Sequence, residues 1–113
     1  MMISNELLFA VESIAKQNPE GFTLDLRTME FVSAGIVAAY KDTQHSFGRA
    51  GLHRCIEHAL YNDGFIGGWL NPDGHMQYDS CKVFRDREKA IKFGKKNEQY
   101  SIFDLDAMQE IRL

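Results

Sequence analysis

The chain has 113 residues, of which 44% are hydrophobic and 26% charged, and its formal net charge is −3. This length and composition predict one globular domain over residues 1–113 and exclude the disordered and collagen-like classes. No apolar stretch reaches the roughly 18 residues of a membrane span, and the N-terminus lacks a signal-peptide pattern. We therefore expect a cytoplasmic protein with no membrane partner.

The first third of the chain reads as a helix followed by two strands. Ser4 is a suitable N-cap, apolar residues follow it at helical spacing, and Asn18-Pro19 ends the pattern, which predicts a helix over about 4–17. From Gly21 onward, apolar and polar residues alternate as in a strand that is buried on one face. The run 31–40 is apolar and rich in β-branched residues, which predicts a second strand covered on both faces.

The middle of the chain predicts a helix and a hairpin. Apolar residues recur at i, i+3, i+4, i+7 and i+8 from Leu52 to Leu60, so we expect a helix that starts near 46–48 and ends at 62–64. The segment 65–84 then reads as two strands joined by the turn 71–74, whose sequence is Asn-Pro-Asp-Gly.

The last third repeats this order. Asp86 is a suitable N-cap for a helix that ends about Asn97, and 100–105 and 110–113 read as a short strand pair. The predicted fold class is α+β, with three helices on an antiparallel or mixed sheet of about six strands in the order αββαββαββ.

The first and third units also match at single residues. Leu24-Asp25-Leu26 corresponds to Phe103-Asp104-Leu105, and Asn18 corresponds to Asn97, at an offset of 79 to 80 residues. Two explanations stay open. The match can reflect an internal duplication, or it can reflect chance and the capping and turn residues that αββ units share.

No arrangement of reactive residues predicts a catalytic or metal site. His53 and His58 are five residues apart, so on a helix their rings point in different directions and the zinc-binding spacing of four is missed. Cys55 and Cys81 read as buried structural residues rather than nucleophiles. Asp25 and Asp104 would form a carboxylate pair only if the similar units were neighbours, and we expect ordinary solvent-facing side chains. No metal and no cofactor are predicted.

The charges are unevenly distributed along the chain. Between Lys82 and Lys96 there are seven basic and two acidic residues, whereas the remainder has six basic and fourteen acidic residues. A basic stripe along the third helix is the candidate for weak nucleic-acid binding, and a solvated helix face is the simpler interpretation. The stripe consists of Arg85, Lys89, Lys92 and Lys96.

Two glycines beside the single Trp mark the hairpin as the candidate ligand or partner surface. Glycine weakens a strand unless a bulge forms there or another group approaches the backbone closely. That group can be the second helix, with Trp69 as part of its apolar floor, or a protein partner, a second copy of the chain or a small ligand. The candidate residues are Gly67, Gly68, Trp69, His75, Tyr78 and Asp79.

Several segments resemble small uncharacterised proteins of anaerobic gut bacteria and their phages and mobile elements. They are 21–27, 43–48 with Gly51-Leu52, 67–69, 78–80, 97–99 and 102–105. The resemblance implies an accessory role in the cytoplasm and carries no activity, cofactor or functional residue.

The residues themselves predict a non-enzymatic binding or accessory protein, because folding signals are present throughout and a reactive constellation is not. The alternative is a small enzyme or ligand-binding domain with a pocket near the Trp69 hairpin. Convergence of His75, Tyr78 and Asp79 in a deep pocket would favour the alternative, and a flat surface with an exposed apolar patch would favour the first.

Overall fold

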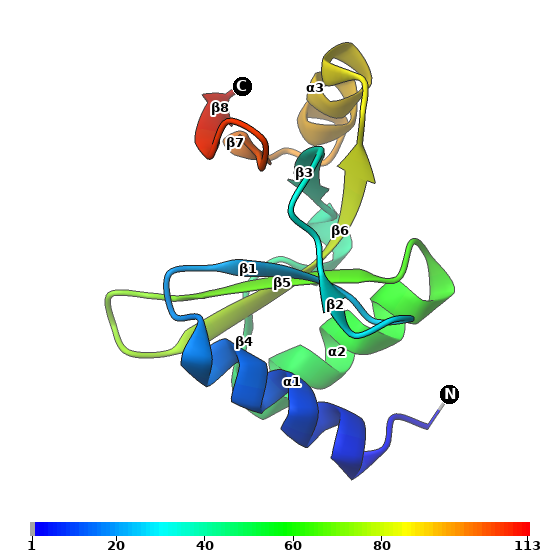
Figure 1. The fold of residues 1–113 in the computed structure, drawn as a ribbon, viewed down its shortest axis with the longest axis vertical. Helices are drawn as coiled ribbons and strands as arrows, with labels where there is room; N and C mark the ends of the chain where they lie inside the picture. Colours follow the sequence, from blue (N-terminus) through cyan, green and yellow to red (C-terminus); the bar gives the residue numbers. More distant parts are fainter. Residues whose placement is uncertain (1) are drawn as a thin grey trace.

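A computed structural model describes residues 2–113 (Figure 1). In this range there are three α-helices, α1 (Asn5–Gln17), α2 (Gly48–Tyr61) and α3 (Arg87–Lys96), and one 3-10 helix, η1 (Lys41–Thr43). The strands are β1 (Phe22–Asp25), β2 (Glu30–Phe31), β3 (Ile36–Ala39), β4 (Ser46–Phe47), β5 (Phe65–Leu70), β6 (Met76–Phe84), β7 (Ser101–Asp104) and β8 (Gln109–Arg112). The α+β class and the three helices are confirmed, whereas the number of strands is eight rather than about six. None of the helices in residues 2–113 combines the length and apolar character that crossing a bilayer requires.

The helix boundaries follow from local chemistry. The Ser4 hydroxyl accepts a hydrogen bond from the Leu7 amide at the start of α1, and the Asp86 carboxylate accepts from the first turn of α3. At the end of α2, Gly64 adopts φ +83° and its amide donates to the Ala59 carbonyl. The capping residues can be recognised in the sequence, and for this reason the predicted helix boundaries agree closely with the observed ones.

The strands form one sheet in which every pairing is antiparallel. The order is β2-β1-β5-β6-β3-β7-β8, and β4 pairs with β6 beside this path. The β5–β6 hairpin lies near the middle, and its turn closes as predicted, with Gly74 at φ +90° and its amide donating to the Asn71 carbonyl.

The predicted strand over 31–40 is wrong. It divides into β2 and β3, which lie four places apart in the sheet, and the predicted order αββαββαββ therefore fails at this point. The division occurs at Gly35, which adopts φ +95° and passes so close to β6 that a Cβ atom on it would lie 2.8 Å from Val83 Cγ1. Residues 32–35, the crossing segment, connect the two strands (Figure 1).

The short crossing segment requires a curved sheet. Four strand spacings separate β2 from β3, about 19 Å along the sheet, whereas the chain from Phe31 to Ile36 spans at most about 18 Å when fully extended. The Val32 amide donates to the Thr23 carbonyl, and the Gly35 amide donates to Asp106 Oδ2, so both ends of the segment are fixed. The sheet must therefore bend so that this segment crosses its concave side.

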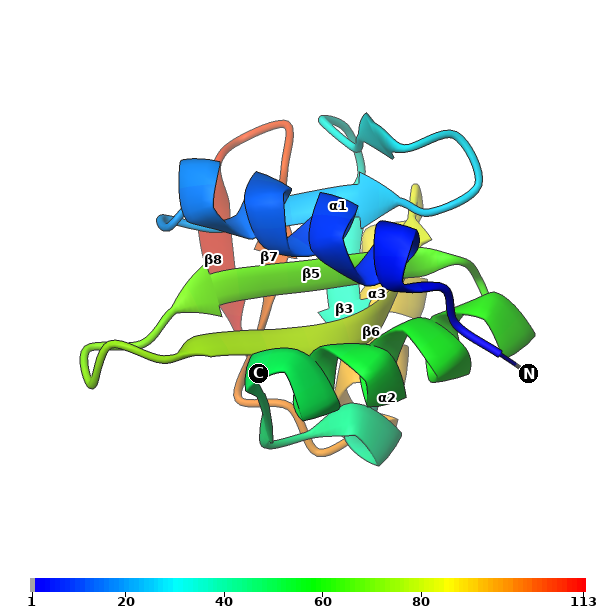
Figure 2. The same ribbon diagram turned by 90° about the horizontal axis from the view of Figure 1, so that it is seen from below.

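All three helices cover the other, convex face of the sheet. In β6, Tyr78 packs in the core beneath α1 and α2, and Phe84, on the same face by strand alternation, contacts Phe93 of α3 with ring centroids 5.2 Å apart. Figure 2 shows α1 and α2 side by side over β5 and β6. The concave face has no helix over it in residues 2–113, and it is available for other contacts.

The first and third αββ units resemble each other in the turns of their hairpins, β1–β2 and β7–β8. Met29 and Met108 both adopt positive φ, and Asp25 pairs with Glu30 as Asp104 pairs with Gln109. The packing differs, however. Leu24 is fully buried under the helices, whereas the corresponding Phe103 is 36% exposed. The two hairpins thus bury opposite faces, and the residue match does not extend to the core.

Candidate functional site

The concave face of the sheet contains two open cavities that share the crossing segment as a common wall. We call them the Trp69 cavity, of about 720 Å³, and the Arg85 cavity, of about 910 Å³. Phe31, Val32 and Ser33 line both. Both volumes lie within the usual range for small-molecule sites, about 300–1,000 Å³.

Asp79 is the central group of the Trp69 cavity. It lies opposite Gly67 in the β5–β6 pairing, and a Cβ atom on Gly67 would stand only 2.8 Å from Asp79 Oδ1. Gly67 therefore makes room for the carboxylate. Burial raises the pKa of Asp79 to about 7. Within residues 2–113 no hydrogen bond or charge of the protein contributes to this pKa, so the carboxylate has no partner to stabilise its ionised form.

Aromatic rings line the same cavity as this carboxylate. Trp69 on β5 is 37% exposed, and Phe103 on β7 and Phe31 on β2 are also partly exposed. They come from three strands that the curvature of the sheet brings to one cavity. The concave face therefore presents exposed aromatic surface in the cavity that contains Asp79.

The charged residues that line the Trp69 cavity are all acidic. They are Asp79, Glu20 before β1 and Glu110 on β8, and the lining contains no Lys, Arg or His. The cavity thus combines negative charge with aromatic surface, which suits a positively charged or hydrogen-bond-donating ligand.

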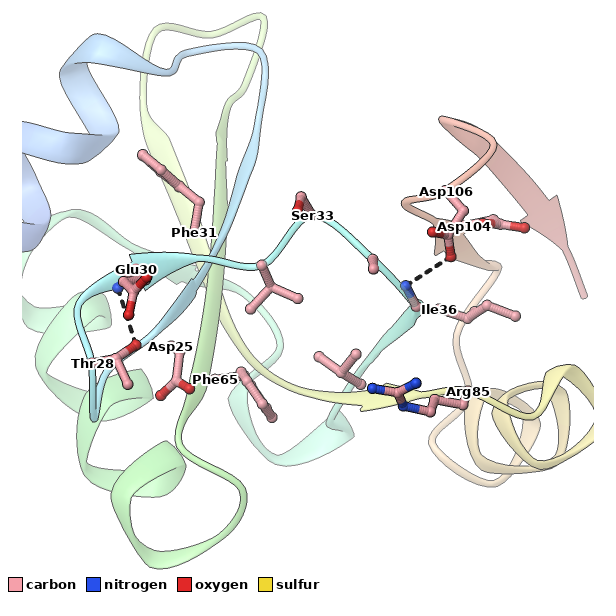
Figure 3. A pocket seen from close by; sticks show the side chains of 14 residues that line it. Asp25, Thr28, Glu30, Phe31, Ser33, Ile36, Phe65, Arg85, Asp104 and Asp106 are labelled. Carbon is pink, nitrogen blue, oxygen red and sulfur yellow. Dashed lines mark hydrogen bonds between the residues drawn. The ribbon is translucent and has the colours of Figure 1, made fainter.

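The Arg85 cavity is more polar, and three of its four carboxylates already have structural roles (Figure 3). The Asp25 carboxylate accepts from the Arg27 amide at 2.9 Å, that of Asp104 accepts from the Ala107 amide at 3.1 Å, and that of Asp106 holds Gly35. Asp25 and Asp104 lie on opposite walls of the cavity (Figure 3). They stabilise turns and do not form a carboxylate pair.

The hairpin residues expected at the candidate surface divide between three places. Gly67, Gly68, Trp69 and Asp79 line the Trp69 cavity. Tyr78 is only 3% exposed and lies in the core beneath α2, and His75 is exposed at the tip of the hairpin. His75, Tyr78 and Asp79 thus do not converge in one pocket.

The groups that approach the backbone closely at Gly67 and Gly68 are strand side chains, not residues of α2. A Cβ atom on Gly68 would lie 2.9 Å from Phe22 and 3.1 Å from Tyr78, so this glycine accommodates two rings on the convex face. The floor beneath Leu52 and Ile56 includes Ile66 and Tyr78 rather than Trp69. The two neighbouring glycines therefore serve opposite faces of the strand.

A Ser, a His and an Asp also meet at the end of α2. His58 Nδ1 lies 2.8 Å from Ser80 Oγ, and His58 Nε2 lies 3.2 Å from Asp42 Oδ2. A carboxylate only accepts, so Nε2 carries the proton in the neutral ring and the Ser80 hydroxyl donates to Nδ1. Ser80 is fully buried, however, and no substrate can reach its oxygen. We interpret the three residues as a structural network.

Replacing Ser80 with Ala should lower the free energy of unfolding by about 1 kcal/mol, because one buried hydrogen bond is lost. Ser101→Ala is the matched control, since the Ser101 hydroxyl donates to Glu110 in an exposed position, and it should change the stability by less than about 0.5 kcal/mol. Urea unfolding of both variants measures the difference. Equal effects would show that the Ser80 network has no special structural role.

Both cysteines are free and fully buried, as the sequence indicates. Burial raises the pKa of Cys55 to about 11 and that of Cys81 well above its ordinary value. Both side chains are therefore protonated thiols at neutral pH, which excludes them as activated nucleophiles.

Three residues of the predicted basic stripe, Lys89, Lys92 and Lys96, lie exposed on α3, whereas Arg85 precedes the N-cap Asp86 and lines the Arg85 cavity, so the stripe on the helix is shorter than predicted. Within residues 2–113, Arg85, Lys89, Lys92 and Lys96 form no ion pair with a carboxylate. Nucleic-acid binding through these residues remains a hypothesis, and a solvated helix face remains the simpler interpretation.

The charge of the whole chain opposes binding of nucleic acid through this stripe. We expect no binding to duplex or single-stranded DNA or RNA at about 0.15 M salt. Fluorescence anisotropy with labelled oligonucleotides over a range of salt concentrations measures it. Binding that weakens steeply with salt, and is lost when Lys89 and Lys92 become Glu, would contradict this expectation and support the nucleic-acid hypothesis.

Comparison of the chain with protein-family models, with curated proteins and with solved structures gives no match. The resemblance to proteins of gut bacteria and their mobile elements thus remains a prediction, and the functional inference rests on the geometry of the site.

Proposed function

We propose that this protein is a non-enzymatic binding module that takes a small ligand in the Trp69 cavity. The observation that carries the proposal is the Asp79 carboxylate, which opens into the cavity without a protein partner. An unpaired carboxylate enclosed by protein costs stability, and such groups occur most often where they serve a function. A ligand that donates hydrogen bonds or positive charge would supply the missing partner.

The exposed rings support the same site. Trp69 on β5 and Phe103 on β7 offer partly exposed apolar surface in the cavity that contains the carboxylate. The lining offers hydroxyl groups but no His or Lys to activate them as nucleophiles, and the Glu110 carboxylate is already bound by Ser101 and Arg112. Binding without chemistry is therefore the function that this geometry supports best, and the two buried free thiols support a role in the cytoplasm.

A second candidate, a small enzyme, is favoured by one observation. A carboxyl group with a pKa of about 7 can act as a general acid or base at neutral pH. The two candidates differ in outcome, because an enzyme would convert its bound ligand and a binding module would release it unchanged. Mass spectrometry of the recovered ligand distinguishes them.

Trp69 is the single Trp of the chain, so its fluorescence reports on this cavity directly. We expect that some compounds in a library of cationic, neutral and anionic fragments change its emission saturably. Absence of a response to every compound would contradict the proposal. A change that coincides with a doubled solution mass would show instead that the apolar surface joins two copies of the chain.

Replacing Trp69 with Ala should abolish binding of the fragments found, as measured by calorimetry. The variant should lose about 1–2 kcal/mol of stability, less than the ~3–5 kcal/mol of a fully buried aromatic residue, because Trp69 is 37% exposed. His75→Ala, at the exposed tip of the same hairpin, is the control and should keep both binding and stability. A Trp69→Ala variant that binds normally would exclude this cavity as the site.

A further inference from the structure

We propose that the ligand of the Trp69 cavity is a small organic cation, an alkylated ammonium or similar group on an apolar body, with its charge beside Asp79 and its body against Trp69 and Phe103. The inference rests on the proposed function and adds the chemical class of the ligand.

Charge complementarity is the first argument. Asp79, Glu20 and Glu110 line the cavity from three different segments, and no basic side chain shares the lining. An anionic ligand would meet the unpaired Asp79 carboxylate together with Glu20 and Glu110, of which, within residues 2–113, Glu110 alone has a basic partner, Arg112 outside the lining, at 3.3 Å. A neutral ligand could donate a hydrogen bond to Asp79 but would leave its negative charge uncompensated, whereas a cation would neutralise it.

The aromatic surface is the second argument. The face of a Trp or Phe ring attracts a cation through the negative potential above the ring, and Trp is the most effective. Trp69, Phe31 and Phe103 are all partly exposed, and all line this cavity. An alkylated ammonium group uses both features, because its methyl groups pack against the rings and its charge faces the carboxylate.

The approach to Asp79 is the third argument. Gly67 lies across from it on β5, and any side chain there would displace the carboxylate, since the Cβ atom alone would stand 2.8 Å from Oδ1. The opening above Asp79 is therefore kept free by a glycine. Gly67→Ala should weaken cation binding by moving the carboxylate.

The ionisation of Asp79 gives the inference a pH signature. The other titratable groups around it are Glu20, Glu110 and the thiols of Cys81 on β6 and Cys55 on α2. The negative charge of Asp79 contributes to the raised pKa of both thiols. The strands β1, β3, β5 and β7 present Thr23, Val37, Trp69 and Phe103 to the cavity, which do not titrate. Because the pKa of Asp79 is about 7, cation binding should strengthen as the pH rises through neutrality.

A pair of isosteric probes tests the inference. Choline and 3,3-dimethyl-1-butanol have the same shape, but choline has a permanently charged nitrogen where the alcohol has carbon. We expect choline to bind at least roughly tenfold more tightly at about pH 8, and this preference to fall several-fold at about pH 5.5. Calorimetry at both pH values measures it, and the charge of choline itself does not change with pH.

Three variants assign the effect. Asp79→Asn, which keeps the size of the side chain, should remove the preference for choline and its pH dependence. Glu20→Gln and Glu110→Gln should each weaken the preference by less than Asp79→Asn does, because Glu20 is exposed and Glu110 is ion-paired with Arg112. Loss of the preference in either Glu variant, with retention in Asp79→Asn, would overturn the role given to Asp79.

The outcomes separate this inference from the proposed function. Equal binding of the two probes would overturn the cation assignment and leave the binding function intact. No response of the cavity to fragments of any charge would overturn the function itself. A trimethyl-lysine peptide, compared with choline, identifies the source of the cation, because tighter binding of the peptide indicates a protein side chain and tighter binding of choline a free metabolite.

Discussion

Replacing Asp79 with Asn should raise the free energy of unfolding by roughly 2–4 kcal/mol at about pH 8 and leave it almost unchanged at about pH 4. The carboxyl group has an ordinary pKa of 3.8 and a folded-state pKa of about 7, because burial disfavours its charged form. Each pKa unit corresponds to about 1.4 kcal/mol, and the partial exposure of the side chain reduces the total.

The sign follows from proton binding. Between about pH 4 and pH 7 the folded protein holds a proton on Asp79 that the unfolded chain has lost, so the stability of the native protein falls as the pH rises through this window. Asn carries no charge, so the Asp79→Asn variant should not lose stability in this pH window. Urea unfolding of both proteins at several pH values measures it, with the exposed Glu20→Gln as a control. A difference of the same size at pH 4 and pH 8 would show that titration of Asp79 is not the cause.

Replacing Gly68 with Ala should lower the stability by roughly 1–3 kcal/mol, whereas Gly67→Ala should cost less than about 1 kcal/mol. The new Cβ atom at Gly68 would lie 2.9 Å from Phe22 and 3.1 Å from Tyr78, and Tyr78 is held in the core. At Gly67 the nearest atom is the end of the Asp79 side chain, which can move into the cavity.

The two glycine variants thus separate folding from binding. Denaturant unfolding should show the larger loss for Gly68→Ala, and calorimetry with a bound fragment should show the larger loss for Gly67→Ala. The reverse pattern would mean that the faces of β5 have been assigned wrongly.

The helices and the central hairpin could be predicted because their signals are local. Ser4, Asp86 and Gly64 occupy the capping positions that their chemistry favours, and the turn 71–74 holds a suitable residue at each place. The division of 31–40 into two strands could not be predicted from strand propensity. It depends on the close passage of Gly35 over β6, a contact between residues distant in the sequence.

The candidate site was only partly readable from the sequence. Gly67, Gly68 and Trp69 pointed to the hairpin, but Tyr78 and Asp79 were grouped on one surface although neighbouring strand residues face opposite sides. This alternation is enough to predict that Tyr78 and Asp79 lie on opposite faces of the sheet. The contributions of Phe31 and Phe103 depend on the curvature of the sheet, and the meeting of His58 with Ser80 and Asp42 depends on the packing of α2, so no local pattern indicates either.

The most direct test of the binding site is a map of backbone amide chemical shifts in a ¹⁵N-labelled sample titrated with choline or with the tightest fragment found. We expect the largest changes on the concave face, at Thr23, Val37 and Gly67, with no comparable changes along α1, α2 or α3. Changes concentrated on the basic stripe of α3, or spread over the helices that cover the convex face, would contradict the assignment of the Trp69 cavity.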